Sequence, residues 1–171
     1  MKRYLLAGLL VVVVAVSLPV PQASHAGKPS RQRVRFVPLH VYLDPGDRPL
    51  AAYQFELAGR EPARASSSEE DNALRRHYES RIRIVGVEGG EHRAFNDAPY
   101  YDPAALQNDR IIIAAFNTGD DLPTGRTRVA TLHLQVLGDA EPEYQLDLVT
   151  AADANGSEIP VEITFETGER K

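Results

Sequence analysis

Short segments in which apolar and polar residues alternate make up most of the chain after its first 33 residues. In the first of these segments Val37, Leu39, Val41 and Leu43 share one parity. A period of two places such side chains on one face of a β-strand and is typical of strands with one buried face. Further segments with the length and composition of strands are 51–57, 82–87, 111–116, 128–136, 144–148 and 159–165, and most of them alternate in the same way. Strands of this kind, with turn residues between nearly all of them, predict an all-β fold of the sandwich type.

Three sequence features predict where strands bend or end. Pro38 has no N–H to give to a sheet, which indicates that its segment lies at a sheet edge or at a bulge. Residues 44–47, Asp-Pro-Gly-Asp, have the composition of a turn. Asn155 and Gly156 lie between two alternating segments and predict a two-residue type I′ hairpin turn, which requires a positive φ at both residues.

The alternation stops in residues 58–80, an inserted polar connection. Within it Ser67 and Glu70 have the spacing of a capping box, and the acids nearby favour the positive end of a helix dipole. We therefore expect one short helix over about 69–78, carried on a long connection, with its charged face in solvent.

Residues 1–26 have the order of a secretory signal peptide. Two basic residues precede an apolar run over 4–18, prolines follow, and small residues end the segment at Ala26. The run is shorter than the ~20 residues that span a bilayer as a helix. We expect cleavage near Ala26, a secreted, periplasmic or cell-envelope location, and no membrane contact afterwards; the alternative is an uncleaved anchor. The expected organisation is a signal peptide (1–26), a flexible lead-in (27–33), one sandwich domain (34–166) and a C-terminal tail (167–171).

Composition excludes several kinds of chemistry. The 171-residue chain contains neither Cys nor Trp, so disulfides, thiol catalysis, thiolate-bound zinc and iron–sulfur clusters are excluded. The formal charge is −5, and removal of residues 1–26, which hold two bases and no acid, would leave 145 residues at −7. Without a basic excess we expect no nucleic-acid partner. A domain of this size buries about 68–70% of its unfolded surface, enough to fold without disulfides.

The stretch from Gly86 to Pro103 is the least like ordinary scaffolding. It combines two adjacent glycines, a histidine next to an acid, and two consecutive tyrosines. Such side chains can bind a metal or stack on a sugar; the alternative is an ordered connection in which glycines adopt positive φ and tyrosines anchor the loop. The candidate binding residues here are Glu88, His92, Tyr100, Tyr101 and Asp102.

Outward positions of the segment 128–136 are a second candidate surface. Ala130, Leu132, Leu134 and Val136 have one parity, and the residues between them have the other. This second set could supply a flat contact face with a few apolar anchors and a polar rim. It consists of Val129, Thr131, His133 and Gln135, of which the last three are candidate binding residues.

Metal binding and catalysis have little support in the sequence. The five histidines form no H-x-x-x-H or H-E-x-x-H pair, so we expect no zinc. Residues 153–158 are similar to the opening of a calcium loop without its final ligands, and calcium is the one ion that stays open. There is no G-x-S-x-G motif, and adjacent Asp120 and Asp121 do not provide two carboxylates about 5–10 Å apart across a cleft. We expect no enzyme and no cofactor.

The order of the segments resembles the cohesin domain and, more broadly, the related sandwiches of carbohydrate-binding modules. The resemblance covers about residues 34–165, nearly the whole chain after the signal segment. Its motifs are strand and turn features in a characteristic order, at residues 49–57, 84–90, 108–116, 125–136 and 153–156.

The resemblance implies a jelly-roll β-sandwich of about eight to nine strands that is extracellular and non-catalytic. Cohesins dock a partner protein on one sheet face, and in polysaccharide-degrading assemblies this partner is a dockerin. The insertion at residues 58–80 and the presence of a single module depart from scaffold cohesins, so a stand-alone cohesin-like protein is expected. Two alternatives stay open: a carbohydrate-binding module that stacks Tyr100 and Tyr101 on polysaccharide, and a structural component of the envelope.

Overall fold

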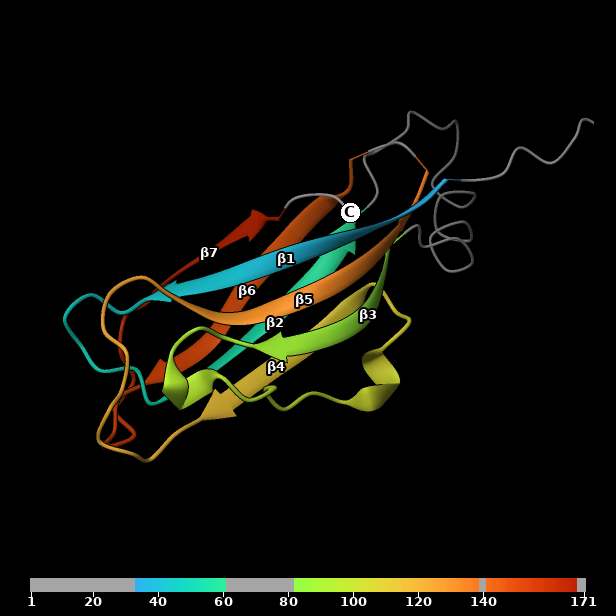
Figure 1. Cartoon of the computed structure of the whole chain (residues 1–171). Coiled ribbons are helices and arrows are strands. Elements are labelled where there is room, and N and C mark those ends of the chain that lie inside the picture. The colour runs from blue at the N-terminus through green and yellow to red at the C-terminus, as the bar shows by residue number, and fades with distance from the viewer. Residues whose placement is uncertain (1–32, 61–81, 139–140, 169–171) are drawn as a thin grey trace, which may run out of the picture. The chain divides into compact units, whose positions relative to one another are not determined.

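The computed structural model describes residues 33–60, 82–138 and 141–168. Within these ranges the chain forms seven strands and two short 3₁₀ helices (Figure 1). The 3₁₀ helices are η1 (Arg93–Phe95) and η2 (Pro103–Ala105). None of the helices in this part of the chain is long and apolar enough to cross a membrane. The strands are β1 (Val34–Asp44), β2 (Ala52–Arg60), β3 (Ile82–Gly89), β4 (Arg110–Phe116), β5 (Thr127–Leu137), β6 (Glu143–Ala152) and β7 (Glu162–Thr167).

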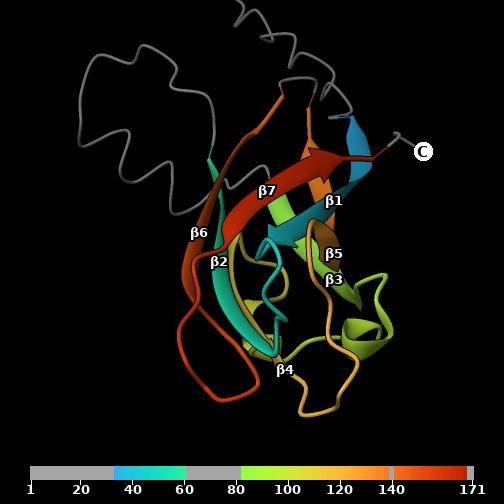
Figure 2. The same ribbon diagram turned by 90° about the vertical axis from the view of Figure 1, so that its left-hand side faces the viewer.

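The strands form two antiparallel sheets, one in the order β3-β5-β1-β7 and one in the order β4-β2-β6. Figure 2 shows the two layers from the side on which β6 and β7 lie next to each other. The predicted all-β sandwich is confirmed. The described ranges hold seven strands where eight to nine were expected, and β7 extends one residue beyond the expected boundary at 166. The helix expected over 69–78 lies outside the described residues.

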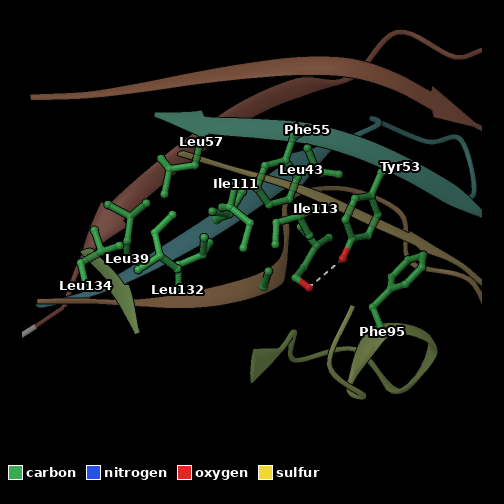
Figure 3. Close-up of a cluster of buried hydrophobic side chains, with 14 of the residues drawn as sticks. Leu39, Leu43, Tyr53, Phe55, Leu57, Phe95, Ile111, Ile113, Leu132 and Leu134 are labelled. Atoms are coloured by element: carbon green, nitrogen blue, oxygen red, sulfur yellow. Dashed lines mark hydrogen bonds between the residues drawn. The ribbon is translucent and has the colours of Figure 1, made fainter. Parts of the chain in front are cut away.

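Side chains of the predicted parity fill the space between the sheets (Figure 3). Leu39 from β1 and Phe55 from β2 are fully buried, and Phe95 from η1 closes one end of the cluster. Phe95 packs edge-on against the ring of Tyr53. The buried hydroxyl of Tyr53 donates a hydrogen bond of 3.0 Å to the carbonyl oxygen of Val129, which joins the two sheets. Burial raises the pKa of Tyr53 above its usual value.

Pro38 lies in an interior strand, just beyond the end of the ladder between β1 and β7. β1 pairs with β5 along its length, whereas its pairing with β7 begins at Leu39. The N–H of Gly168, just after β7, donates to the carbonyl oxygen of Pro38 at 2.8 Å. The missing N–H of Pro38 therefore costs no bond in the sheet. The predicted edge is a local one, and the bulge in the β1–β5 pairing lies elsewhere, with Val129 of β5 as the extra residue opposite Val41 and Tyr42.

The turn at Asn155 and Gly156 differs from the predicted type I′. Gly156 has a φ of 76°, but Gln107 is the one non-glycine residue with a positive φ among those described, so Asn155 does not meet the requirement. Asp153 shapes the turn instead, because its Oδ1 accepts hydrogen bonds from the N–H groups of Asn155 and Ser157. The flanking strands β6 and β7 belong to different sheets, so this turn begins a crossing from one sheet to the other.

The glycines after β3 serve close packing and not unusual backbone angles. Neither Gly89 nor Gly90 has a positive φ, so the role expected for them is wrong. A Cβ atom on Gly90 would lie 2.7 Å from the Cα atom of Val129, and one on Gly89 would lie 2.5 Å from the carbonyl oxygen of Asp97. Only glycine allows the loop over 90–109 to lie this close to β5 and to its own later residues.

Candidate functional site

The candidate residues from the sequence fall into three separate environments. One group belongs to the outer face of the four-stranded sheet, a second caps the two 3₁₀ helices, and the third is the tyrosine pair. In this order the groups are Glu88, Thr131, His133 and Gln135; His92 and Asp102; and Tyr100 and Tyr101.

The first group makes contacts within the four-stranded sheet. Thr131 is only 3% exposed, and its hydroxyl forms a hydrogen bond of 3.0 Å with Nδ1 of His40 on β1. Nε2 of His133 lies 3.0 Å from Oε1 of Glu88 on β3, an ion pair when the ring is protonated. Thr131 is thus paired within the sheet, and Glu88 lies within ion-pair distance of His133, whose buried Nε2 makes no hydrogen bond within the described ranges. The outward face of β5 is therefore less available to a partner than the alternation predicts.

Val129 and Gln135, the apolar and amide residues of the predicted β5 surface, are buried to different degrees. Val129 is fully buried at the bulge of β5, so the prediction that it faces outward is wrong. Gln135 is half-buried, in register with Phe36 on β1 and Arg83 on β3. This face therefore offers His133, Glu88, part of Gln135 and, beside Gln135 on β1, the exposed ring of Phe36.

His92 and Asp102 hold the turns of the loop that follows β3. Nδ1 of His92 accepts a hydrogen bond from the N–H of Ala94, and its Nε2 lies 3.9 Å from a carboxylate oxygen of Asp121. Oδ1 of Asp102 accepts a hydrogen bond of 2.9 Å from the N–H of Ala104. Each side chain is thus the N-cap of a 3₁₀ helix, which gives both residues a structural role in positioning this loop.

The two consecutive tyrosines have different environments and do not form one platform. Tyr101 is half-buried and packs against the hydrophobic core, whereas Tyr100 is 67% exposed. Tyr100 is held at the edge of β4, where it exchanges two backbone hydrogen bonds with Ala114, of 2.7 and 2.9 Å. Neighbouring side chains of an extended segment point to opposite sides, so two tyrosines that are adjacent in the sequence do not lie side by side.

The ring of Tyr100 stacks on Phe116, a residue that the sequence analysis did not select. The ring centroids are 5.9 Å apart, the planes are inclined by 9°, and Phe116 is itself 63% exposed. Ala114 and Phe116 have the same parity on β4, so the pair stands on the outer face of the three-stranded sheet. The two rings form an exposed aromatic ridge along one side of this face.

Two further large apolar side chains are exposed on strands of this sheet. Ile112 is exposed on the same face of β4, and Val149 is exposed at the bulge of β6. The outward positions near them include the uncharged residues Ala52, Gln54, Ala114 and Thr150, and the charged Glu56 lies beside Ile112. We call Tyr100, Ile112, Phe116 and Val149 the apolar patch; four of the seven large hydrophobic side chains exposed in the described ranges belong to it.

A bidentate ion pair borders the patch. Nη2 of Arg110 on β4 donates to Oε2 of Glu56 on β2 at 2.7 Å, and its Nε contacts Oε1. The hydrogen bonds from Arg110 lower the pKa of Glu56 below its usual value, which favours the ionised carboxylate. Glu56 is in register with Ile112 on one side and Asp147 on the other, which gives the apolar patch a charged border.

The sequence carries a weak signal for Phe116 and Ile112. The run Ile111–Phe116 is apolar at both parities, whereas a strand with one solvated face should be polar at every second position. Excess apolar residues on the outward parity are the mark of a contact surface. The bulge that exposes Val149 has no comparable signal in the sequence.

The described ranges contain no metal-binding cluster. No group of three or more His, Asp or Glu side chains there could hold an ion. Asp153, the first residue of the segment similar to a calcium loop, uses Oδ1 to accept two backbone hydrogen bonds.

Comparison with known proteins gives no assignment: no family model, no curated protein and no solved structure matches the chain. The resemblance to cohesin domains therefore stays a prediction.

Proposed function

We propose that this protein is a secreted, non-catalytic, cohesin-like binding module that docks a partner protein on the outer face of the β4-β2-β6 sheet. The observation that carries the proposal is the apolar patch, in which large apolar side chains are exposed together. Exposed patches of this kind, rimmed by polar residues, are typical of interaction sites. Interface hot spots are rich in aromatic residues near the centre of such a face.

The geometry of the ridge favours a protein partner over a sugar. Tyr100 and Phe116 stack on one another, so each ring has already used one of its two faces. A sugar ring needs a broad free aromatic face, whereas protein side chains can pack against ring edges. The charged border of Glu56 and Arg110 then supplies the polar rim that protein interfaces possess.

The order of strands and turns in the sequence supports the same proposal, since cohesins dock dockerins through a sheet face. A dockerin-type partner, in an extracellular assembly that degrades polysaccharide, is the corresponding form of the hypothesis. Export through the segment 1–26 would place the module where such assemblies act. Mass spectrometry of protein recovered outside the cytoplasm tests export: the chain should begin at Gly27, and protein that still carries Met1 contradicts it.

Capture experiments with matched variants test docking. The immobilised protein is exposed to the secreted proteins of its source organism, beside Tyr100→Ala/Phe116→Ala and Val34→Ala/Phe36→Ala variants. The second pair is a matched control, because Val34 and Phe36 are exposed apolar residues of the other sheet. We expect one discrete protein on the wild type and the control that is missing from the Tyr100/Phe116 variant; equal capture by all three contradicts the proposal.

A carbohydrate ligand is the second candidate, favoured by the exposure of Tyr100. Affinity electrophoresis in gels that contain soluble polysaccharides separates the two functions. Retardation that disappears in Tyr100→Ala and Phe116→Ala supports sugar binding, while unchanged migration in every gel supports the protein partner.

A further inference from the structure

The three-stranded sheet ends at β6 in a strand edge whose backbone groups are unpaired within the described ranges. The backbone N–H and C=O groups of Ala114 bond with Tyr100, on the side of β4 that faces away from β2. The backbone groups of the residues on either side of Ala114 therefore point towards β2. Because the direction of the backbone groups alternates along antiparallel strands, the N–H and C=O groups of Asp147 and Gln145 on β6 point towards β2. The residues of the opposite parity therefore direct their N–H and C=O groups away from the sheet: Tyr144, Leu146 and Leu148.

The same parity is seen directly where the edge closes. The carbonyl oxygen of Ala151 points away from β2 and accepts a hydrogen bond of 2.9 Å from the N–H of Ile159. A bridge between Ala152 and Glu158 continues this closure for one more residue. The open part of the edge thus runs from residue 144 to 148, about 17 Å of strand.

The side chains of this open edge belong to the core but are only half-buried. Tyr144, Leu146 and Leu148 all pack against the hydrophobic core with part of their surface in solvent. Across from them, Phe165 of β7 is 37% exposed and meets the ring of Tyr144 edge-on at 5.7 Å. The side of the sandwich between β6 and β7, seen in Figure 2, therefore has an open main-chain edge above incompletely covered apolar side chains.

Charge is distributed unevenly around this edge. Residues 141–168 contain seven acids and no Lys, Arg or His, although the whole chain carries only −5. Two of these acids are matched, Glu141 by Arg35 and Glu166 by Arg126. On β6 itself Glu143 and Asp147 are exposed, and within the described ranges neither forms an ion pair with a base. Strand edges are usually protected by charged side chains, Pro or bulges; β6 has no Lys or Pro, its charged side chains are these two acids, and its bulge at Val149 lies beyond the open stretch 144–148.

We propose that the β6 edge is a second docking site, which takes an extended peptide segment of a partner by strand addition. The segment alternates apolar and basic residues. Its backbone pairs with Tyr144, Leu146 and Leu148, its apolar side chains cover the half-buried residues between β6 and β7, and its Lys or Arg side chains meet Glu143 and Asp147 on the outer face. Main-chain pairing gives such complexes affinity and the alternate side chains give them specificity.

The proposal predicts binding of a short synthetic peptide in which valine and lysine alternate, measured by calorimetry on the full chain. Amide hydrogen exchange should slow about tenfold at Tyr144, Leu146 and Leu148 when the peptide is present. A peptide of identical sequence with N-methyl groups on alternate amides keeps the charges and side chains but cannot pair, and it should not bind. A valine–glutamate peptide should also fail, because its charges repel those of β6.

Variants of the protein separate edge pairing from general attraction between opposite charges. Glu143→Gln/Asp147→Asn should weaken binding of the valine–lysine peptide about fivefold at low salt, while Asp97→Asn/Asp120→Asn, a matched pair of exposed acids on loops, should leave it unchanged. Equal binding of the N-methylated peptide overturns the proposal. Slow exchange of the three β6 amides in the protein alone also overturns it, because residues 61–81 or a second copy would then already occupy the edge.

Discussion

The rings of Tyr100 and Phe116 lie nearly parallel, with centroids 5.9 Å apart, although 16 positions separate the two residues in the chain. Tyr100 is fixed by two backbone hydrogen bonds to Ala114, and Phe116 belongs to β4 itself. Both anchors are therefore held in place before any partner arrives. A contact surface organised in this way loses little conformational entropy on binding, which raises affinity.

Removal of the Tyr53 hydroxyl should destabilise the fold without changing its shape. In Tyr53→Phe the carbonyl oxygen of Val129 loses its buried donor, a change that costs about 1–3 kcal/mol. Urea unfolding followed by circular dichroism measures the loss. Tyr42→Phe is the control, because the ring of Tyr42 lies under the guanidinium of Arg126 and needs no hydroxyl for that contact; equal losses in both variants would contradict the structural role of Tyr53.

Gly90→Ala should destabilise the protein, and Gly86→Ala should not. A methyl group at Gly90 meets the backbone of β5, which cannot move without breaking the sheet, so we expect a loss of about 1–3 kcal/mol. At Gly86 the nearest atom would be 3.6 Å away in His133, and the loss of glycine entropy from the unfolded chain should stabilise by about 0.5–1 kcal/mol. Thermal unfolding of both variants checks this; similar shifts would refute the close approach.

The phenol of Tyr144 should ionise at a higher pH than an ordinary tyrosine, which makes the stability of the fold depend on pH in the alkaline range. Burial, with a smaller contribution from the charge of Glu141, raises its pKa to about 12. Because the folded pKa exceeds the unfolded value of about 10, this contribution to stability is complete below pH 10 and is lost as pH rises towards 12. In an absorbance titration of tyrosinate, the wild type should show an ionisation near pH 12 that is missing in Tyr144→Phe. If the variant instead lacks an ionisation near pH 10, the burial of Tyr144 is contradicted.

The turn at Asp153 should depend on its side chain and not on calcium. Asp153→Ala removes the acceptor of two backbone hydrogen bonds and should cost about 1 kcal/mol, while Asp153→Asn keeps an acceptor oxygen and should cost less. Millimolar calcium should leave the melting temperature of the wild type unchanged, because this carboxylate oxygen is already engaged. A calcium-dependent rise that disappears in Asp153→Asn would show an ion site here.

The alternation of apolar and polar residues predicts the interior of this fold well. The buried parities of β1 and β2, from Val37 to Leu43 and from Tyr53 to Leu57, follow directly from burial on one face. Which strands share a sheet does not follow, because β6 and β7 are consecutive in sequence yet pair in different layers. The turn at Asn155 was also predicted wrongly, because the side chain of Asp153 supplies hydrogen bonds that a two-residue motif does not anticipate.

The surface was harder to predict than the interior. Glu88 and His133 were selected and are exposed or half-exposed, yet the two lie within ion-pair distance of each other. Tyr100 was selected with Tyr101 as its companion, whereas its true companion, Phe116, comes from the next strand. Contacts between outward side chains depend on register and on bulges, and those are set by long-range pairing that a single sequence does not display.

The affinity of the purified partner for single variants, measured by calorimetry, tests the central claim most directly. The account predicts that Tyr100→Ala weakens docking about tenfold or more, as truncation of a central aromatic anchor does, while Phe36→Ala on the opposite sheet changes affinity less than about twofold. Equal affinities for the wild type and Tyr100→Ala, or a larger loss in Phe36→Ala, would contradict docking on the β4-β2-β6 face.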